Sequence, residues 1–148
     1  MSKQNLQVSV SIDRDPEDVI RFIADLRNRM KYLQSLKGVS NIQGDPGQVT
    51  KSWDWKWDLL GHEFTGTAKT IHYAPGRRYS FATEGGIKSQ FTYNAEPEGS
   101  GTKLTVEVEA EIPAELAGIE GLDQLLAGAQ EKGQQSMQKL KSLLESSS

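Results

Sequence analysis

Apolar and polar residues alternate along several segments of the chain, and a period of two predicts β-strands. The first segment places Leu6, Val8, Val10 and Ile12 between polar neighbours, which indicates a strand with one buried face. Turn residues rich in glycine and proline separate the later segments. Six further strands are predicted in this way, at residues 39–43, 49–59, 62–73, 77–84, 87–95 and 104–112.

Other segments have apolar residues at steps of three and four, which is the period of a helix. A first helix is predicted to start at Pro16, after the capping residue Asp15. A short second helix is predicted at residues 27–35 and a long one at residues 121–145. The second helix is expected to turn three side chains inward, those of Met30, Tyr32 and Leu33.

The long helix has an interrupted apolar stripe. Gly128 and Gly133 lie in its middle, where each glycine costs about 1 kcal/mol relative to alanine. Two interpretations remain open: the glycines permit close backbone packing or local strain, or the middle of the helix roofs a space. The whole order of elements, with hairpin-connected strands and few helices, predicts an α+β fold with an antiparallel sheet.

Composition narrows the classes of function. The 148 residues predict a single domain spanning residues 1–148, and the net charge of −3 argues against non-specific nucleic-acid binding. The chain has no cysteine, no apolar leader and no apolar run long enough to span a membrane. A cytoplasmic protein without a membrane span is therefore expected.

Several motifs resemble a known family. They are the helix entry RDPEDVIRFIADLRN, the later YAPGRRYSF and EPEGSGTKLTVEVE, and the long final helix. Together they look like the polyketide cyclase/dehydrase and lipid-transport (SRPBCC) superfamily, whose helix-grip, START-like fold is shared with the birch-pollen allergen. The resemblance implies a seven-stranded antiparallel sheet wrapped around the C-terminal helix, with two short helices after the first strand. One departure is that Tyr32 stands where the family often has Trp followed by Pro.

Three tryptophans at strict period two form the strongest local signal. A two-residue hairpin loop at Leu60-Gly61 would pair Trp57 with Phe64, Trp55 with Gly66 and Trp53 with Ala68, and the small partners would leave room for the rings. Across the next turn, a four-residue loop at residues 74–77, Thr70 is expected to meet Phe81 and His72 to meet Tyr79. A two-residue turn at residues 85–86 would turn polar residues inward, so a bulge or a three-residue loop is predicted, which buries Phe91 and Tyr93.

These aromatic side chains could pack a plain core, line a ligand cavity, or form an outward stripe at a homodimer interface. The ligand-lining hypothesis adds two residues of the final helix to the aromatic face. Its members are Trp53, Trp55, Trp57, Phe64, Tyr79, Phe81, Phe91, Tyr93, Leu126 and Met137.

Candidates for chemistry are few. His72, Tyr79 and Tyr93 are the titratable side chains expected nearest the inner face, and the two histidines do not make a metal site. No cofactor is expected. The first functional hypothesis is the binding of a small hydrophobic, lipid-like or aromatic ligand in a cavity between the sheet and the C-terminal helix. The alternatives are a cofactor-free cyclase or dehydratase acting on a polyketide-like substrate, and a protein-interaction module.

Overall fold

The computed structural model describes residues 3–33, 36–44, 50–59, 61–85, 88–111 and 121–146. Its helices are α1 (Pro16–Ala24), the 3₁₀ helix η1 (Leu26–Lys31) and α2 (Leu122–Ser146). The strands are β1 (Lys3–Ile12), β2 (Leu36–Gln43), β3 (Ser52–Leu59), β4 (His62–Ala74), β5 (Arg78–Gly85), β6 (Ser89–Glu98) and β7 (Gly101–Glu111).

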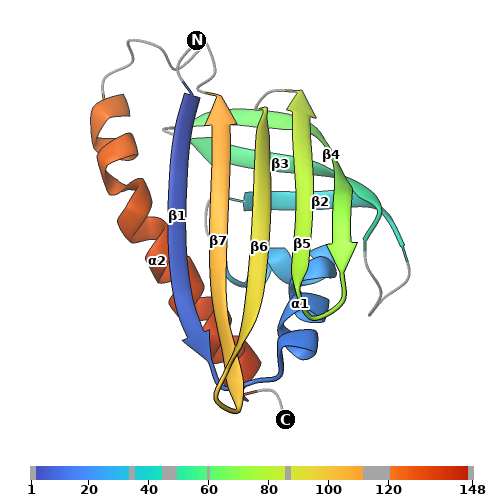
Figure 1. Cartoon of the computed structure of the whole chain (residues 1–148). Helices are drawn as coiled ribbons and strands as arrows, with labels where there is room; N and C mark the ends of the chain where they lie inside the picture. Colours follow the sequence, from blue (N-terminus) through green and yellow to red (C-terminus); the bar gives the residue numbers. More distant parts are fainter. Residues whose placement is uncertain are drawn as a thin grey trace.

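The strands form one seven-stranded antiparallel sheet in the order β1-β7-β6-β5-β4-β3-β2. Strands β2 to β7 lie side by side in the order of the chain, and β1 pairs with β7 at one edge of the sheet. The sheet is strongly twisted, and α1 and the C-terminal end of α2 lie on the same, inner face (Figure 1). This is the helix-grip fold that the sequence predicts.

The core lies on this inner face. Alternate residues in the second half of β1 are buried there, at Val8, Val10 and Ile12, as the alternation predicts. Helix α1 packs against β5, β6 and β7 and buries Val19, Ile20 and Ile23. Its start is fixed by the predicted cap, since the side chain of Asp15 accepts a hydrogen bond from the backbone of Glu17 at 3.3 Å.

Helix α2 lies along β1, which is an edge strand of the sheet (Figure 1). Three of its side chains donate hydrogen bonds to backbone carbonyls of β1. Gln130 Nε2 reaches Gln7 O at 2.8 Å, Gln134 Nε2 reaches Ser9 O at 2.9 Å, and Lys141 Nζ reaches Ser11 O at 2.9 Å. The helix thereby satisfies backbone carbonyls of an edge strand, which would otherwise be free to pair with a strand of another chain.

Gly133 allows this close approach of helix and strand. A Cβ added at Gly133 would lie 3.2 Å from Val8 Cγ1 and 3.3 Å from Leu6 Cδ2, whereas one at Gly128 would meet nothing within 4 Å. Close backbone packing therefore accounts for Gly133, and the polar side chains in the middle of the helix are the ones that hold β1. The apolar stripe resumes after them, where Met137, Leu140 and Leu144 are buried.

The second short helix differs from its prediction. It runs over Leu26–Lys31 as a 3₁₀ helix rather than over residues 27–35. The prediction that Met30 turns inward is wrong, because 46% of this residue is exposed, although Tyr32 is buried as predicted. A 3₁₀ helix has three residues per turn, so the residues that share one face are spaced by three, and here they are Leu26, Arg29 and Tyr32.

Candidate functional site

The tryptophan stripe on β3 has the register that the sequence predicts. Trp53 pairs with Ala68, Trp55 with Gly66 and Trp57 with Phe64 on β4. Trp53 and Trp55 are buried and Trp57 is half-buried, which confirms that the stripe faces inward.

Gly66 makes room for the central ring of the stripe. A Cβ at this position would lie 2.5 Å from Trp55 Cζ2 and 2.1 Å from the Glu84 carbonyl oxygen, closer than real Cβ atoms come. The indole Nε1 of Trp55 donates a hydrogen bond to the Thr67 carbonyl at 3.0 Å, so its polar atom is satisfied within the fold. The indole is therefore held in one orientation by both sterics and hydrogen bonding.

Strands β5 and β6 continue the aromatic face. Phe81 pairs with Phe91 and Tyr79 with Tyr93. This confirms the register predicted from burial, which differs from the register that a two-residue turn at residues 85–86 would give. The rings of Phe81 and Phe91 stack with centroids 4.9 Å apart. Trp53 meets Phe81 edge-on at 5.0 Å, which joins the β3 stripe to this pair.

Buried hydrogen bonds position η1 over the sheet. Thr50 accepts a hydrogen bond from the backbone N–H of Leu26 through Oγ1 at 3.0 Å and donates its own N–H to Ala24 O at 2.9 Å. Its carbonyl accepts from the hydroxyl of Thr70 on β4 at 2.6 Å. The start of η1 is thus tied to the sheet by a residue that is 0% exposed.

Arg29 is the residue that η1 places over the aromatic face. It is 4% exposed, and its Nη1 donates a hydrogen bond to Tyr93 Oη at 2.9 Å. The guanidinium carbon lies 4.7 Å from the ring centroids of both Phe81 and Phe91, which is within cation–π range. A permanently charged side chain is therefore buried among aromatic rings.

Three tyrosine hydroxyls surround this cation. Burial raises the pKa of Tyr79 and the pKa of Tyr32 well above the usual value of a phenol, so both are neutral at physiological pH. The Tyr79 hydroxyl is 3.0 Å from Thr70 Oγ1 and is the donor, because Thr70 gives its own proton to a carbonyl. Burial lowers the pKa of Arg29 and the neighbouring phenols raise it, with a net upward shift that keeps the guanidinium charged.

A cavity of about 170 Å³ remains between η1 and the sheet. Its walls are mainly aromatic and aliphatic, with one cation and two hydroxyl-bearing side chains. The lining residues are Arg29, Leu36, Trp53, Trp55, Trp57, Phe81, Thr83, Ser89, Phe91 and Ala110. Convergent apolar walls with a few polar groups are typical of small-molecule sites.

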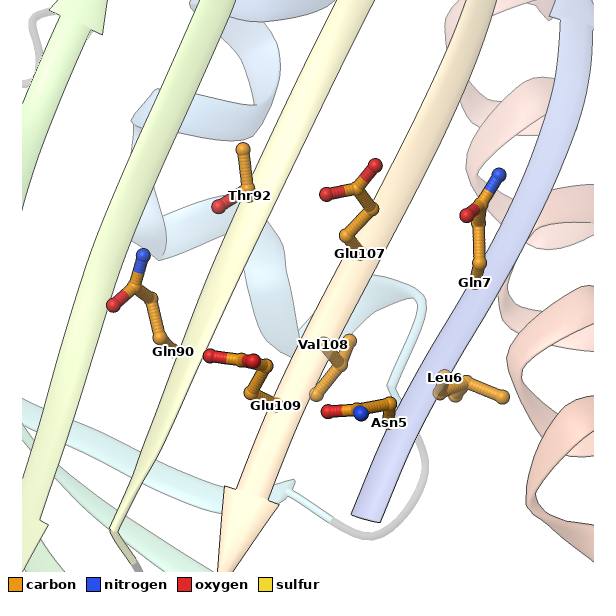
Figure 2. Close-up of a pocket in the computed structure, with 8 residues that line it drawn as sticks. All are labelled: Asn5, Leu6, Gln7, Gln90, Thr92, Glu107, Val108 and Glu109. Carbon is orange, nitrogen blue, oxygen red and sulfur yellow. The ribbon is translucent and has the colours of Figure 1, made fainter. Parts of the chain in front are cut away.

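A larger hollow of about 550 Å³ lies on the opposite, outer face of the sheet (Figure 2). It is lined by side chains of β1, β7 and β6, and its six polar residues stand on the surface of the sheet, Asn5, Gln7, Gln90, Thr92, Glu107 and Glu109. Both glutamates are exposed and therefore solvated by water. An apolar ligand would displace this water without offering the carboxylates a hydrogen bond in return. The smaller inner cavity is therefore the better candidate for a site, despite its volume.

The ligand-lining candidates predicted from the sequence divide into three groups. Five line the cavity, namely Trp53, Trp55, Trp57, Phe81 and Phe91. Phe64, Tyr79 and Tyr93 are buried on the same face but are not among the lining residues. On α2, Met137 is buried without lining the cavity, and the side chain of Leu126 lies outside what the structure describes. That any of them binds a ligand stays a prediction.

The candidate catalytic residues are not brought together at the cavity. A register shift between Thr70 and His72 pairs Thr70 with Phe81, as predicted, but pairs His72 with Ser80 rather than with Tyr79. His72 is consequently exposed. Within the described ranges, no group of three or more histidines or carboxylates is arranged to hold a metal ion.

Sequence reasoning missed Arg29. An α-helical period turns it away from the sheet, and an arginine is the last residue expected in a core. The signal that could have found it is the three-residue spacing of Leu26, Arg29 and Tyr32, which a 3₁₀ helix brings onto one face.

Comparisons with known proteins agree with this architecture. The structure resembles that of TTHA0849 from Thermus thermophilus with a TM-score of 0.76 at 22% identity, covering 98% of this chain and 99% of that one. A START superfamily protein from Mycobacterium smegmatis gives a TM-score of 0.72 at 13% identity over 97% and 99% of the two chains. The Zhui aromatase/cyclase from Streptomyces sp. R1128 gives 0.71 at 12% identity over 97% and 94%. No curated protein matches the chain.

The fold and its inner cavity define a START-like protein. The sequence model of the family "Polyketide cyclase / dehydrase and lipid transport" matches residues 3–145, and the chain belongs to this family. The description of the family names polyketide cyclases, dehydrases and lipid transport. Among the helices of the described chain, none is both long and apolar enough to cross a membrane.

Proposed function

We propose that this protein binds a small, largely apolar ligand in the cavity between η1 and the aromatic face of the sheet. The observation that carries the proposal is the cavity itself, with three tryptophans and two phenylalanines converging on about 170 Å³ of space. If these rings served only as a hydrophobic core, we would expect them to pack against one another without a cavity, because protein interiors are packed as densely as organic crystals. Membership of a ligand-binding superfamily supports the same conclusion.

The size of the cavity sets the size of the ligand. Apolar cavities of about 150 Å³ hold a benzene molecule, whereas drug-sized ligands need about 300–1,000 Å³. The ligand is therefore a compact ring system of one or two rings, or the end of a longer apolar molecule. The aromatic side chains of Trp53, Trp55 and Phe91 in the lining favour a flat ligand, which contacts more of an aromatic wall than a branched one does.

The alternative of a cofactor-free cyclase or dehydratase needs a group that exchanges a proton near neutral pH. Among the cavity-lining residues that the structure describes, Arg29 is the titratable one, and its pKa lies too high for that role. Binding is consequently the function that the cavity supports best.

The test is a titration of tryptophan emission with fatty acids, flavonoids, quinones and naphthalene derivatives. A ligand that contacts an indole changes its emission saturably. Ala110→Leu extends a side chain into the cavity, so we expect it to weaken the affinity at least about 10-fold, as a lost buried contact of about 1.4 kcal/mol would.

The matched control is Ala82→Leu, the same substitution on β5, which β6 separates from β7. Alternation with the inward Phe81 and Thr83 places residue 82 on the outer face of the sheet. This variant should bind like the parent. The proposal fails if no compound of the panel gives saturable binding to the parent, or if the two leucine variants weaken binding equally.

A further inference from the structure

The residues that the structure describes around Arg29 do not neutralise its charge. In the described part of the chain, no carboxylate forms an ion pair with Arg29, although six such pairs form elsewhere. Its described neighbours are the faces of Phe81 and Phe91 and the hydroxyls of Tyr32, Tyr79 and Tyr93, and none of these groups is a carboxylate. Burying a cation without a counter-charge costs several kcal/mol, and cation–π contacts return only part of that cost.

The hydrogen-bonding capacity of Arg29 is also incompletely used. A guanidinium carries five N–H donors in a planar fork. Within the described chain one of them makes a well-formed hydrogen bond, from Nη1 to Tyr93 Oη, and the Tyr32 hydroxyl interacts with the same guanidinium. The same side chain lines the cavity, so a molecule seated there meets the guanidinium. Two stacked rings and one hydrogen bond hold the fork in place before any ligand arrives, which reduces the entropy that binding must cost.

We propose that the cavity selects a compact apolar acid whose carboxylate, or an equivalent oxyanion, pairs with Arg29 while its ring system lies against the tryptophans. This inference rests on the proposed function and adds the charge and polarity of the ligand to it. A planar oxyanion accepts two parallel N–H bonds from an arginine, and a dry aromatic site strengthens them. The apolar body fills the rest of the space between Trp53, Trp55 and Trp57.

The test compares two naphthalenes of nearly equal shape, 2-naphthoate and 2-naphthalenemethanol, by isothermal titration calorimetry. The first carries a carboxylate and the second a neutral hydroxyl. We expect the parent protein to bind 2-naphthoate at least about 10-fold more tightly, as a desolvated charge-assisted pair would give. Lowering the pH until the naphthoate is protonated should abolish the preference without changing the affinity for the alcohol.

Arg29→Met assigns the preference to one side chain. It removes the charge and the donors while keeping the length and apolar character of the stem, so the two affinities should become equal within about two-fold. Lys31→Met, which removes an exposed cation from the same 3₁₀ helix, should leave the preference intact.

The possible outcomes separate the two proposals. Equal affinities of the parent for the acid and the alcohol overturn the inference and leave the proposed function standing, whereas saturable binding of neither compound overturns both for this class of ligand. A preference that survives Arg29→Met also overturns the inference. If this variant does not fold, the parent's preference and its loss at low pH decide the question.

Discussion

Helices cover two regions of the sheet in different ways. At the β1 edge, α2 holds the strand with polar side chains that bond its carbonyls, and Gly133 brings the helix close enough for this contact. Over the middle of the sheet, η1 places a buried arginine above the rings of Phe81 on β5 and Phe91 on β6, and a cavity remains. The first contact satisfies three carbonyls of β1, whereas the second, among the described residues, leaves N–H donors of Arg29 unused and a cavity unfilled.

The difference separates a region that contributes to stability from the region in which we propose that a ligand binds. A satisfied helix–strand contact gains nothing from a further molecule. An uncompensated cation beside an apolar void is costly unless a ligand offsets it. Changes at the β1 edge should therefore alter stability alone, whereas changes around the cavity should alter binding as well.

The largest effect is expected from removing residues 121–148. Met137, Leu140 and Leu144 are almost fully buried, and losing each burial costs roughly 1.5–3 kcal/mol, while a whole domain is stable by only about 5–15 kcal/mol. The truncated chain should show no cooperative thermal transition by circular dichroism. A sharp transition near that of the parent would show that α2 is not required for the fold.

Gly66→Ala should be the most damaging single substitution among the strand glycines. The added methyl would collide with the backbone at Glu84 and with the Trp55 ring, so we expect a loss of about 3 kcal/mol or more in urea unfolding, together with weaker ligand binding. Gly38→Ala, where the nearest atom lies 3.9 Å away, is the matched control and should change stability by less than about 1 kcal/mol. Equal losses in the two variants would contradict the tight packing of Trp55.

Alkaline pH should destabilise the cavity region. The pKa values of Tyr32 and Tyr79 are raised by burial in the folded state, so the unfolded chain releases these protons first. Their stabilising effect is complete below about pH 10 and is lost as the pH rises above it, by up to about 1.4 kcal/mol per pH unit for each group. Urea unfolding between about pH 9 and 11 should show this slope, and Tyr79→Phe should reduce it; a flat profile in the parent would refute the assignment.

The smallest effect is expected at the β1 edge. Gln134→Ala removes one exposed hydrogen bond to Ser9, which should cost about 0.5–1.5 kcal/mol and leave the affinity for 2-naphthoate unchanged. Gln138→Ala, at an exposed glutamine four residues further along the same helix, is the control and should be neutral within about 0.5 kcal/mol. A change of affinity in Gln134→Ala would mean that the two regions are coupled.

The pairing of the strands could be predicted in detail because it depends on patterns within each strand and on the turns between neighbouring strands. Alternation along each strand and the geometry of the Gly61 turn fix the partners of all three tryptophans, and the small residues opposite them agree with that register. The bulge near His72 could not be predicted, since it inserts a residue without any composition signal and turns the histidine outward.

The cavity was only half predictable. Its aromatic walls follow from the alternation along the strands. Its cation, Arg29, comes from a short helix, and the sequence does not indicate that this helix has the 3₁₀ period. A change from 3.6 to 3.0 residues per turn replaces Met30 by Arg29 on the inner face. The chemistry of the site thus depends on a backbone choice made by long-range hydrogen bonds, those of Thr50 to η1 and β4.

The most direct test of the account is an NMR titration of the ¹⁵N-labelled protein with 2-naphthoate and, separately, with 2-naphthalenemethanol. The account predicts saturable shifts of the indole N–H signals of Trp53, Trp55 and Trp57, with the side-chain amide signals of Gln130 and Gln134 unchanged. Shifts confined to α2 and the β1 edge, or no saturable shift of any indole with either compound, would contradict it.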